Sequence, residues 1–173
     1  MKIKIKSLLI FIIPVFILVI FFLALGENKV YDTKNLTGKK ISDFKLIGLD
    51  EKKNITENDL TNNNYTLINL WASWCSPCRL EHKYLMTLKK DYNLKILGIN
   101  FKDNTKNATK YLKESGNPYY FVAKDVDGKT SIQFGTYGIP ESILINKKLI
   151  IIKKYIGPIN DKSLNEIIKV IKK

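Results

Sequence analysis

The sequence predicts an α/β fold in which a central mixed sheet is flanked by helices, with an apolar helix near the N-terminus. Three observations lead to this prediction. Strand-like and helix-like patterns alternate between Thr66 and Glu114, strands and an amphipathic helix follow towards the C-terminus, and residues 7–25 form an uncharged apolar run. With 173 residues, 45% of them hydrophobic, the chain is long enough for one domain with a buried core.

The apolar run from Ser7 to Leu25 is predicted to be a transmembrane helix. It carries no charge, and at ~1.5 Å per residue it nearly covers the ~30 Å hydrocarbon core of a bilayer. Lysines precede it, and Glu27 and Asp32 follow it, so residues 1–6 are expected in the cytoplasm and the rest of the chain on the far side. The predicted location is the bacterial inner membrane, single-pass, with the body in the periplasm. A cleaved signal peptide is the alternative.

A polar spacer and a single domain are expected after this run. Residues 26–37 are polar and aperiodic, and residues 38–173 form the predicted domain. The formal net charge is +13. Because the lysines are spread through every segment, without an arginine-rich cluster or an aromatic RNA-binding signature, nucleic-acid binding is not expected. Weak attraction to anionic lipid or to an acidic partner stays open.

A short hairpin and a buried strand are expected to open the domain. The hairpin surrounds a polar turn at residues 50–54, and the strand covers Thr66–Trp71, a run of β-forming residues. An amphipathic helix then begins near Ser76 or Pro77, since proline suits a first helical turn. Its apolar residues recur at four-residue spacing: Leu80, Tyr84 and Leu88.

The rest of the domain continues the alternation. A strand at 94–101 and a helix at 104–114 complete a βαβ unit, which implies parallel strands. A central insertion is expected around residues 102–127. The remaining predicted elements are strands at 119–123, 142–145 and 149–156, a short helix at 129–134, and a C-terminal amphipathic helix carrying Leu164, Ile167, Ile168 and Ile171.

The two cysteines of the chain, Cys75 and Cys78, stand at the junction between a predicted strand and a predicted helix. A thiolate at a helix N-terminus is stabilised by unpaired N–H groups and by the helix dipole. Cys75 is therefore predicted to be a nucleophile, and Cys78, one turn further along, to attack the mixed disulfide that Cys75 forms.

Three other interpretations of the pair are weaker. Haem attachment requires a histidine directly after the second cysteine, where Arg79 stands. A zinc site needs two more ligands, and the chain has one histidine, His82. A purely structural disulfide would gain little from closing so short a loop.

Several motifs resemble known redox proteins. Residues 71–79, Trp-Ala-Ser-Trp-Cys-Ser-Pro-Cys-Arg, resemble the active-site signature of the thioredoxin superfamily, and Tyr137-Gly-Ile-Pro-Glu141 resembles its cis-proline loop. Four motifs resemble a narrower family, the DsbE/CcmG group. They lie at residues 78–82, 98–103, 116–118 and 137–141. This group consists of membrane-anchored proteins of cytochrome c maturation. The resemblance implies a thioredoxin fold with an N-terminal β extension.

The same resemblance implies a function. Reduced Cys75 would donate electrons to a disulfide of apocytochrome c, or of a thiol partner in the maturation system. A membrane reductant of the DsbD or CcdA type would recharge the pair. No cofactor other than the redox-active cysteines, and no metal, is expected. The alternatives are another tethered reductant or oxidase of the ResA/TlpA kind, and a non-enzymatic module that binds apocytochrome or metal.

Further site residues follow from the resemblance. Pro140 matches the cis-proline. Asn69 stands where general thioredoxins carry a buried aspartate, so Glu81 and Glu141 are nominated as the acidic groups that tune thiolate stability and proton transfer. For both glutamates a solvated surface position is the alternative. The residues expected to contact substrate are Trp74, Ser76, Pro77 and Ile139.

Two positions depart from the pattern of this group. Pro158 replaces a commonly acidic residue, and Asn146 stands where aspartate is common. Both are expected to reduce the acidic character of the site. His82 is expected to pack or to face solvent, without a catalytic role.

Overall fold

The computed structural model describes residues 5–25 and 36–172. The chain divides into two compact units, residues 1–32 and 33–173. Residues 1–4 and 26–35, to which most of the predicted cytoplasmic segment and spacer belong, lie outside the described residues.

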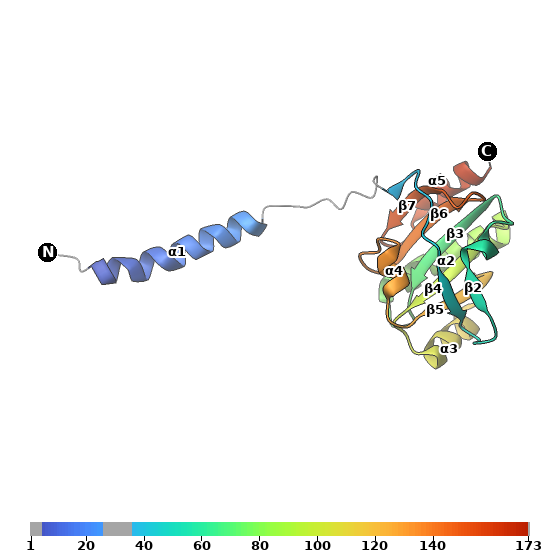
Figure 1. Ribbon diagram of the computed structural model, residues 1–173, viewed down its shortest axis with the longest axis horizontal. Coiled ribbons are helices and arrows are strands. Elements are labelled where there is room, and N and C mark those ends of the chain that lie inside the picture. Colours follow the sequence, from blue (N-terminus) through green and yellow to red (C-terminus); the bar gives the residue numbers. More distant parts are fainter. Residues whose placement is uncertain (1–4, 26–35, 173) are drawn as a thin grey trace. The chain divides into compact units, whose positions relative to one another are not determined.

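The first unit contains one helix, α1 (Ile5–Leu25), with Pro14 inside it (Figure 1). Within the described residues, no helix combines the length and the hydropathy that a membrane span requires.

The described part of the second unit is built on a seven-stranded sheet with the strand order β2-β1-β5-β4-β3-β6-β7 (Figure 1). Its strands are β1 (Lys45–Gly48), β2 (Asn54–Thr56), β3 (Tyr65–Trp71), β4 (Lys95–Phe101), β5 (Phe121–Asp125), β6 (Glu141–Asn146) and β7 (Ile151–Ile156). The pairs β3–β4 and β4–β5 are parallel, and the other neighbours are antiparallel. The predicted mixed sheet is confirmed, and the β1–β2 hairpin extends it as expected.

The α-helices described in this unit follow the predicted positions closely, whereas a short 3₁₀ helix, η2 (Glu57–Leu60), was not predicted. These α-helices are α2 (Ser76–Tyr92), α3 (Thr105–Ser115), α4 (Lys129–Gln133) and α5 (Asp161–Ile171). Two of them begin at an asparagine whose side chain accepts backbone N–H bonds, Asn104 for α3 and Asn160 for α5. Such caps satisfy donors that a helix start leaves unpaired.

Two hydrophobic clusters cover the two faces of the sheet. Leu67 and Trp71 of β3 belong to one cluster, with buried residues of α2, α3 and α5. Ile68 and Leu70 belong to the other, with residues of the β1–β2 hairpin and the region of α4. The division follows from the alternation of side chains along a strand. It places the helix that carries the cysteines against a fully covered strand.

The apolar stripe predicted for α2 is partly wrong. Leu80 is 67% exposed, whereas Glu81 and His82 lie inside with Leu85 and Leu88. Polar residues occupy two positions of the buried face, so apolar spacing alone selects the wrong side for Leu80. The helix is nevertheless amphipathic, and its start agrees with the prediction.

A short segment before β1 covers the start of β7. Gly38 N donates to Ile151 O at 2.8 Å, and Ile151 N donates to Lys39 O at 2.9 Å. Lys40 and Ile150 form an isolated antiparallel bridge. The chain therefore joins the domain beside the first residues of β7.

Gly98 in β4 provides a prediction about packing. A Cβ atom at Gly98 would lie 2.7 Å from two ring atoms of Tyr119 and 2.9 Å from Trp71 Nε1. We expect Gly98→Ala to lower the free energy of unfolding by about 1–3 kcal/mol, because overpacking forces these rings to move. Urea unfolding measures this. Gly138→Ala is the control, since nothing lies within 4 Å of a Cβ there, and equal losses in both variants would contradict the prediction.

Candidate active site

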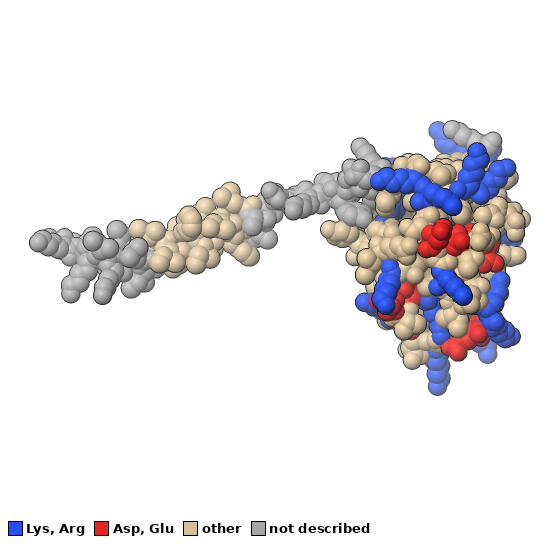
Figure 2. Space-filling model, viewed as in Figure 1, with Lys and Arg blue, Asp and Glu red and all other residues tan. Residues whose placement is uncertain are grey.

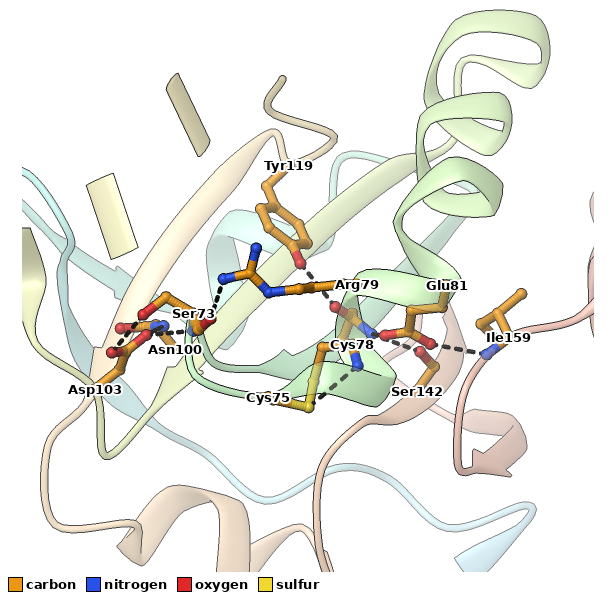
Figure 3. Close-up of a disulfide and its surroundings, with 11 residues drawn as sticks. Ser73, Cys75, Cys78, Arg79, Glu81, Asn100, Asp103, Tyr119, Ser142 and Ile159 are labelled. Atoms are coloured by element: carbon orange, nitrogen blue, oxygen red, sulfur yellow. Dashed lines mark hydrogen bonds between the residues drawn. A yellow bond between two sulfur atoms is a disulfide. The ribbon is translucent and has the colours of Figure 1, made fainter. Parts of the chain in front are cut away.

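The cysteine pair lies where β3 passes into α2 (Figure 3). Cys75 is the N-cap of α2, and its Sγ accepts a hydrogen bond from Cys78 N at 3.2 Å. Pro77 lies in the first turn, which confirms the predicted helix start. The two cysteines form a disulfide and are 3% and 5% exposed. Since Cys75 Sγ faces the start of a helix, negative charge that develops on it would be stabilised.

The loop before Cys75 is held by the end of β4 (Figure 3). Asp103 accepts from Ser73 N at 2.6 Å, from Ser73 Oγ at 2.9 Å and from Asn100 Nδ2 at 2.9 Å. Arg79 donates from the other side to Ser73 O at 2.8 Å. Asp103 belongs to the motif at residues 98–103, but its contact with Ser73 joins residues thirty positions apart. No local pattern in the sequence indicates this contact. These bonds hold Ser73, two residues before Cys75, from both sides.

Glu81 follows Cys78 by three residues on α2 and is fully buried, and no ion pair among the described residues includes it. Its Oε1 accepts from Asn69 Nδ2 at 2.7 Å, and its Oε2 accepts from Ile159 N at 2.8 Å. Burial raises the pKa of Glu81 from 4.5 to about 7, against the lowering effect of the hydrogen bonds from Ile159 and Asn69. The surface alternative is therefore wrong for Glu81. A group with this pKa exchanges a proton near neutral pH.

Asn69 joins Glu81 to two other elements. Its Nδ2 also contacts Ser142 Oγ at 3.0 Å, and its Oδ1 accepts from Tyr119 Oη at 2.9 Å. Tyr119 is buried and stacks on Trp71 with ring centroids 5.3 Å apart. Burial raises the pKa of Tyr119 well above its ordinary value, so this hydroxyl stays a donor. Tyr119 and Ser142 were not predicted as site residues.

Glu141 is also buried, but its surroundings differ from those of Glu81. Its Oε2 lies 2.7 Å from Lys154 Nζ, and both side chains are almost inaccessible. Its Oε1 accepts from Tyr137 N at 2.9 Å and from Gly138 N at 3.3 Å. The surface alternative is wrong here too. The carboxylate is neutralised by a lysine and anchors the loop that leads to Pro140.

The predicted cis-proline and substrate contacts lie at the cysteine end of the sheet. The Ile139–Pro140 peptide bond is cis, as expected. Glu141 pairs with Leu70 in the sheet, which brings this loop beside the strand leading to the cysteines. Ile139 is half-buried. Of the other predicted contacts, Trp74, Ser76 and Pro77 are exposed.

The two departures from the family pattern lie in different places. Asn146 pairs with Tyr65, at the end of β6 opposite to Glu141, and its side chain accepts from turn N–H groups. The expectation that Asn146 changes the acidity of the site is therefore wrong, because it lies at the end of β6 that is remote from the cysteines. Pro158 directly precedes Ile159, whose N–H donates to Glu81. Pro158 is therefore next to a residue whose backbone contacts the Glu81 carboxylate.

His82 lies inside the domain, 8% exposed. Its Nε2 is 3.1 Å from Ser115 O, and its ring meets Tyr111 edge-on. Burial lowers the pKa of His82. Among the described residues, no group of three or more histidine, cysteine, aspartate or glutamate side chains is arranged to hold a metal ion.

The family and curated relatives agree with this geometry. Residues 36–170 match the model of the Redoxin family. The thiol:disulfide interchange protein DsbE of Haemophilus influenzae is 36% identical over 148 residues, which cover 86% of this chain and 81% of that protein. DsbE of Escherichia coli is 37% identical over 145 residues, with 83% and 78% covered. The interchange protein CycY of Rhizobium leguminosarum is 48% identical over 101 residues, and the match spans 54% of its length.

Solved structures show the same fold. A crystal structure of a Chlorobium tepidum protein provisionally named DsbE superposes with a TM-score of 0.69 at 26% identity, covering 78% of this chain and 96% of that one. A thiol-disulfide oxidoreductase from Bacteroides fragilis gives a TM-score of 0.66 at 24% identity, covering 77% and 99%. The predicted thioredoxin-like fold is thereby confirmed.

Glu81 predicts how stability depends on pH. Because its pKa is raised in the folded state, the unfolded chain loses this proton at lower pH, and the free energy of unfolding falls as pH rises from 4.5 to about 7. The fall approaches about 3 kcal/mol at ~1.4 kcal/mol per unit. We expect Glu81→Gln to abolish it in urea unfolding at a series of pH values. Glu114→Gln, at an exposed carboxylate, should keep it, and an unchanged slope in Glu81→Gln would refute this.

The Lys154–Glu141 pair gives a second prediction. Lys154→Met leaves a buried carboxylate without its cation, so we expect a loss of about 3–5 kcal/mol in unfolding free energy. Adding Glu141→Gln should restore a large part, because the amide oxygen still accepts from the loop N–H groups. Urea unfolding of both single variants and the double variant measures the coupling. Additive losses would show that the two side chains do not depend on each other.

Proposed function

The chain belongs to the DsbE group of thiol:disulfide interchange proteins in the Redoxin family, and we propose that its reduced Cys75 delivers electrons to cytochrome c maturation. The substrate is a disulfide of apocytochrome c, or of a thiol partner in that system. The observation that carries the proposal is a C-x-x-C pair at a helix start, with a buried carboxylate on the same helix, Glu81, whose pKa is raised to about 7.

The reaction transfers two electrons and two protons. The Cys75 thiolate attacks one sulfur of the substrate disulfide, forming a mixed disulfide, and the released substrate sulfur takes up a proton. Cys78 then loses its proton and attacks Cys75 Sγ, which breaks the mixed disulfide and releases the second substrate sulfur as a thiolate that is protonated. The substrate is reduced to two thiols, and the Cys75–Cys78 disulfide forms.

Glu81 accepts the proton of Cys78 in this proposal. The two residues are three positions apart on α2, so their side chains lie on the same face of the helix. The carboxylate is buried and forms no ion pair among the described residues. Its pKa of about 7 suits proton transfer at neutral pH. Asn69 does not titrate. Its amide instead holds Glu81 in place.

Glu141 has a different role in the proposal. Its charge is balanced by Lys154, so we assign it to positioning rather than to proton transfer. It holds Tyr137 N and Gly138 N, and thereby the loop of Pro140 that presents backbone to the substrate. Substrate contact is assigned to the exposed residues of this end and to Ile139 beside them: Trp74, Ser76, Pro77 and Ile139.

The tether and the location complete the proposal. The uncharged sequence of residues 7–25, preceded by lysines, supports a single-pass anchor in the bacterial inner membrane with the domain in the periplasm. A membrane reductant of the DsbD or CcdA type would return electrons to the pair after each cycle. This part rests on the sequence and on the family.

Trapping tests the direction and the partner. We expect Cys78→Ser to accumulate a mixed disulfide through Cys75 with an oxidised peptide carrying the haem-attachment motif C-x-x-C-H. Mass spectrometry of the complex identifies the linked cysteines. Cys75→Ser is the matched control and should trap nothing. Preferential trapping by Cys75→Ser, or a reduction potential of the wild-type pair near ~−120 mV, typical of a strong oxidant, would refute the proposal.

The role of Glu81 is tested by the second chemical step. We expect Glu81→Gln to slow the attack of Cys78 on the mixed disulfide by roughly 100-fold, the usual size of a general-base effect. Rapid quenching at a series of pH values follows the decay, and in the wild type the rate should rise through pH about 7. Glu114→Gln controls for a lost surface charge. A parallel profile in Glu81→Gln would remove Glu81 from the step.

A further inference from the structure

Lysines gather at the end of the domain opposite to the cysteine pair. β3 runs from Tyr65 at this end to Trp71 beside the cysteines, while α2 and α5 run the opposite way and end here. Figure 2 shows Lys and Arg side chains over the part of the domain where α5 ends in Figure 1. We call this surface the basic end, and its lysines are Lys39, Lys40, Lys89, Lys90, Lys95, Lys147, Lys148 and Lys172.

Backbone and ring contacts bring these residues together from distant parts of the chain. Lys147 N donates to Asn64 O at 3.0 Å, next to β3. Lys40 bridges to Ile150, just after the turn that contains Lys148. The ammonium of Lys172 lies over the ring of Tyr92, where α2 ends. The basic end is therefore one continuous region of the fold rather than a run in the sequence.

Lysines outnumber carboxylates at the basic end. The ion pairs seen among the described residues use none of its lysines. Two of these lysines donate hydrogen bonds to neutral oxygen atoms: Lys89 to Asn117 O and Lys95 to Asn93 Oδ1. Asp91 supplies a carboxylate in this region, and others lie at the same end of the sheet, among them Asp50 in the β1–β2 turn and Glu114 near the end of α3, where it pairs with Lys110. All of the lysines except the half-buried Lys95 are exposed.

The cysteine end of the domain has a different charge pattern. Its cations alternate with carboxylates, the set being Arg79, Lys102, Lys106 and Lys129 with Asp103, Asp127 and Asp161. Lys129 and Asp127 form an ion pair there. A lysine-rich composition would charge both ends alike. The asymmetry therefore points to a partner for one of them.

The chain enters the domain at the basic end. The contacts of Gly38 and Lys39 with Ile151 fix this entry. Ten residues, 26–35, lie between Leu25, the last residue of α1, and Leu36. Ten residues of fully extended chain span about 35 Å at most. For a domain tethered by residues 7–25, a connection of this length would allow the basic end to reach lipid headgroups.

We propose that the basic end binds anionic phospholipid headgroups of the membrane that carries the tether. Each lysine near such a surface strengthens binding roughly fivefold, and the attraction decays within a Debye length. The proposal rests on the anchor assigned above and adds an orientation to it. With the basic end on the lipid, the cysteine pair faces away from the membrane, towards soluble polypeptides.

Amine footprinting of the full chain tests this surface. The protein is mixed with vesicles of phosphatidylcholine alone, or with vesicles that also contain phosphatidylglycerol, and its lysines are acetylated and read by mass spectrometry. We expect Lys147 and Lys148 to be protected severalfold by phosphatidylglycerol and to lose protection at high salt. Lys102, Lys106 and Lys129 should react equally in both. Equal protection at the two ends, or none, would overturn the proposal.

Variants that remove the lysine charges complete the test. Lys39→Gln, Lys40→Gln, Lys147→Gln and Lys148→Gln combined should abolish the effect of phosphatidylglycerol, read in this variant as the protection of Lys89, Lys90 and Lys172, without changing disulfide exchange. The matched control combines Lys83→Gln, Lys106→Gln, Lys110→Gln and Lys129→Gln, and should keep it. Flotation with phosphatidylcholine vesicles reports the tether separately, so a chain that does not float fails the anchor and not the basic end. Stronger protection by duplex DNA than by phosphatidylglycerol at physiological salt would overturn the lipid assignment.

Discussion

The side chain of Asn69 is the contact on which the centre of this domain depends. It is completely buried in β3, donates to Glu81 of α2, contacts Ser142 of β6 and accepts from Tyr119 ahead of β5. A buried amide with unsatisfied groups would be costly, and here its partners come from three different elements. The same contacts that satisfy the amide hold the carboxylate of Glu81 on the helix that carries Cys78, so the packing of the core also determines where this carboxylate lies.

Two buried glutamates near the cysteines illustrate how surroundings decide the role of a carboxylate. Burial disfavours the ionised form of Glu81 and raises its pKa, and the neutral donors Ile159 N and Asn69 Nδ2 offset this only in part. Glu141 has Lys154 beside it and keeps two loop N–H groups in place. In the proposed reaction the carboxylate without a cation takes part in proton transfer, and the carboxylate paired with a lysine supports the loop.

The sequence was informative where local patterns suffice. Strand and helix positions followed from β-forming runs, apolar periodicity and cap residues, and the cysteine spacing marked the nucleophile. The orientation of Leu80 was misjudged, because Glu81 and His82 occupy buried positions that hydrophobic spacing does not register. The partners Lys154 and Tyr119 were missed for another reason. Each meets its partner through sheet register or through a contact fifty residues apart, and neither has a local sequence signal.

The segment that meets the start of β7 bears on aggregation. β2 and β7 are the edges of the sheet, and an open edge can pair with any extended chain. β2 has three residues, and β7 is bulged against β6, carries an outward Lys153 and is covered at its first residues by Gly38 and Lys39. A domain whose proposed substrates are unfolded polypeptides meets extended backbone in every encounter. Its edges leave little room for such a chain to add as a further strand and persist as an aggregate.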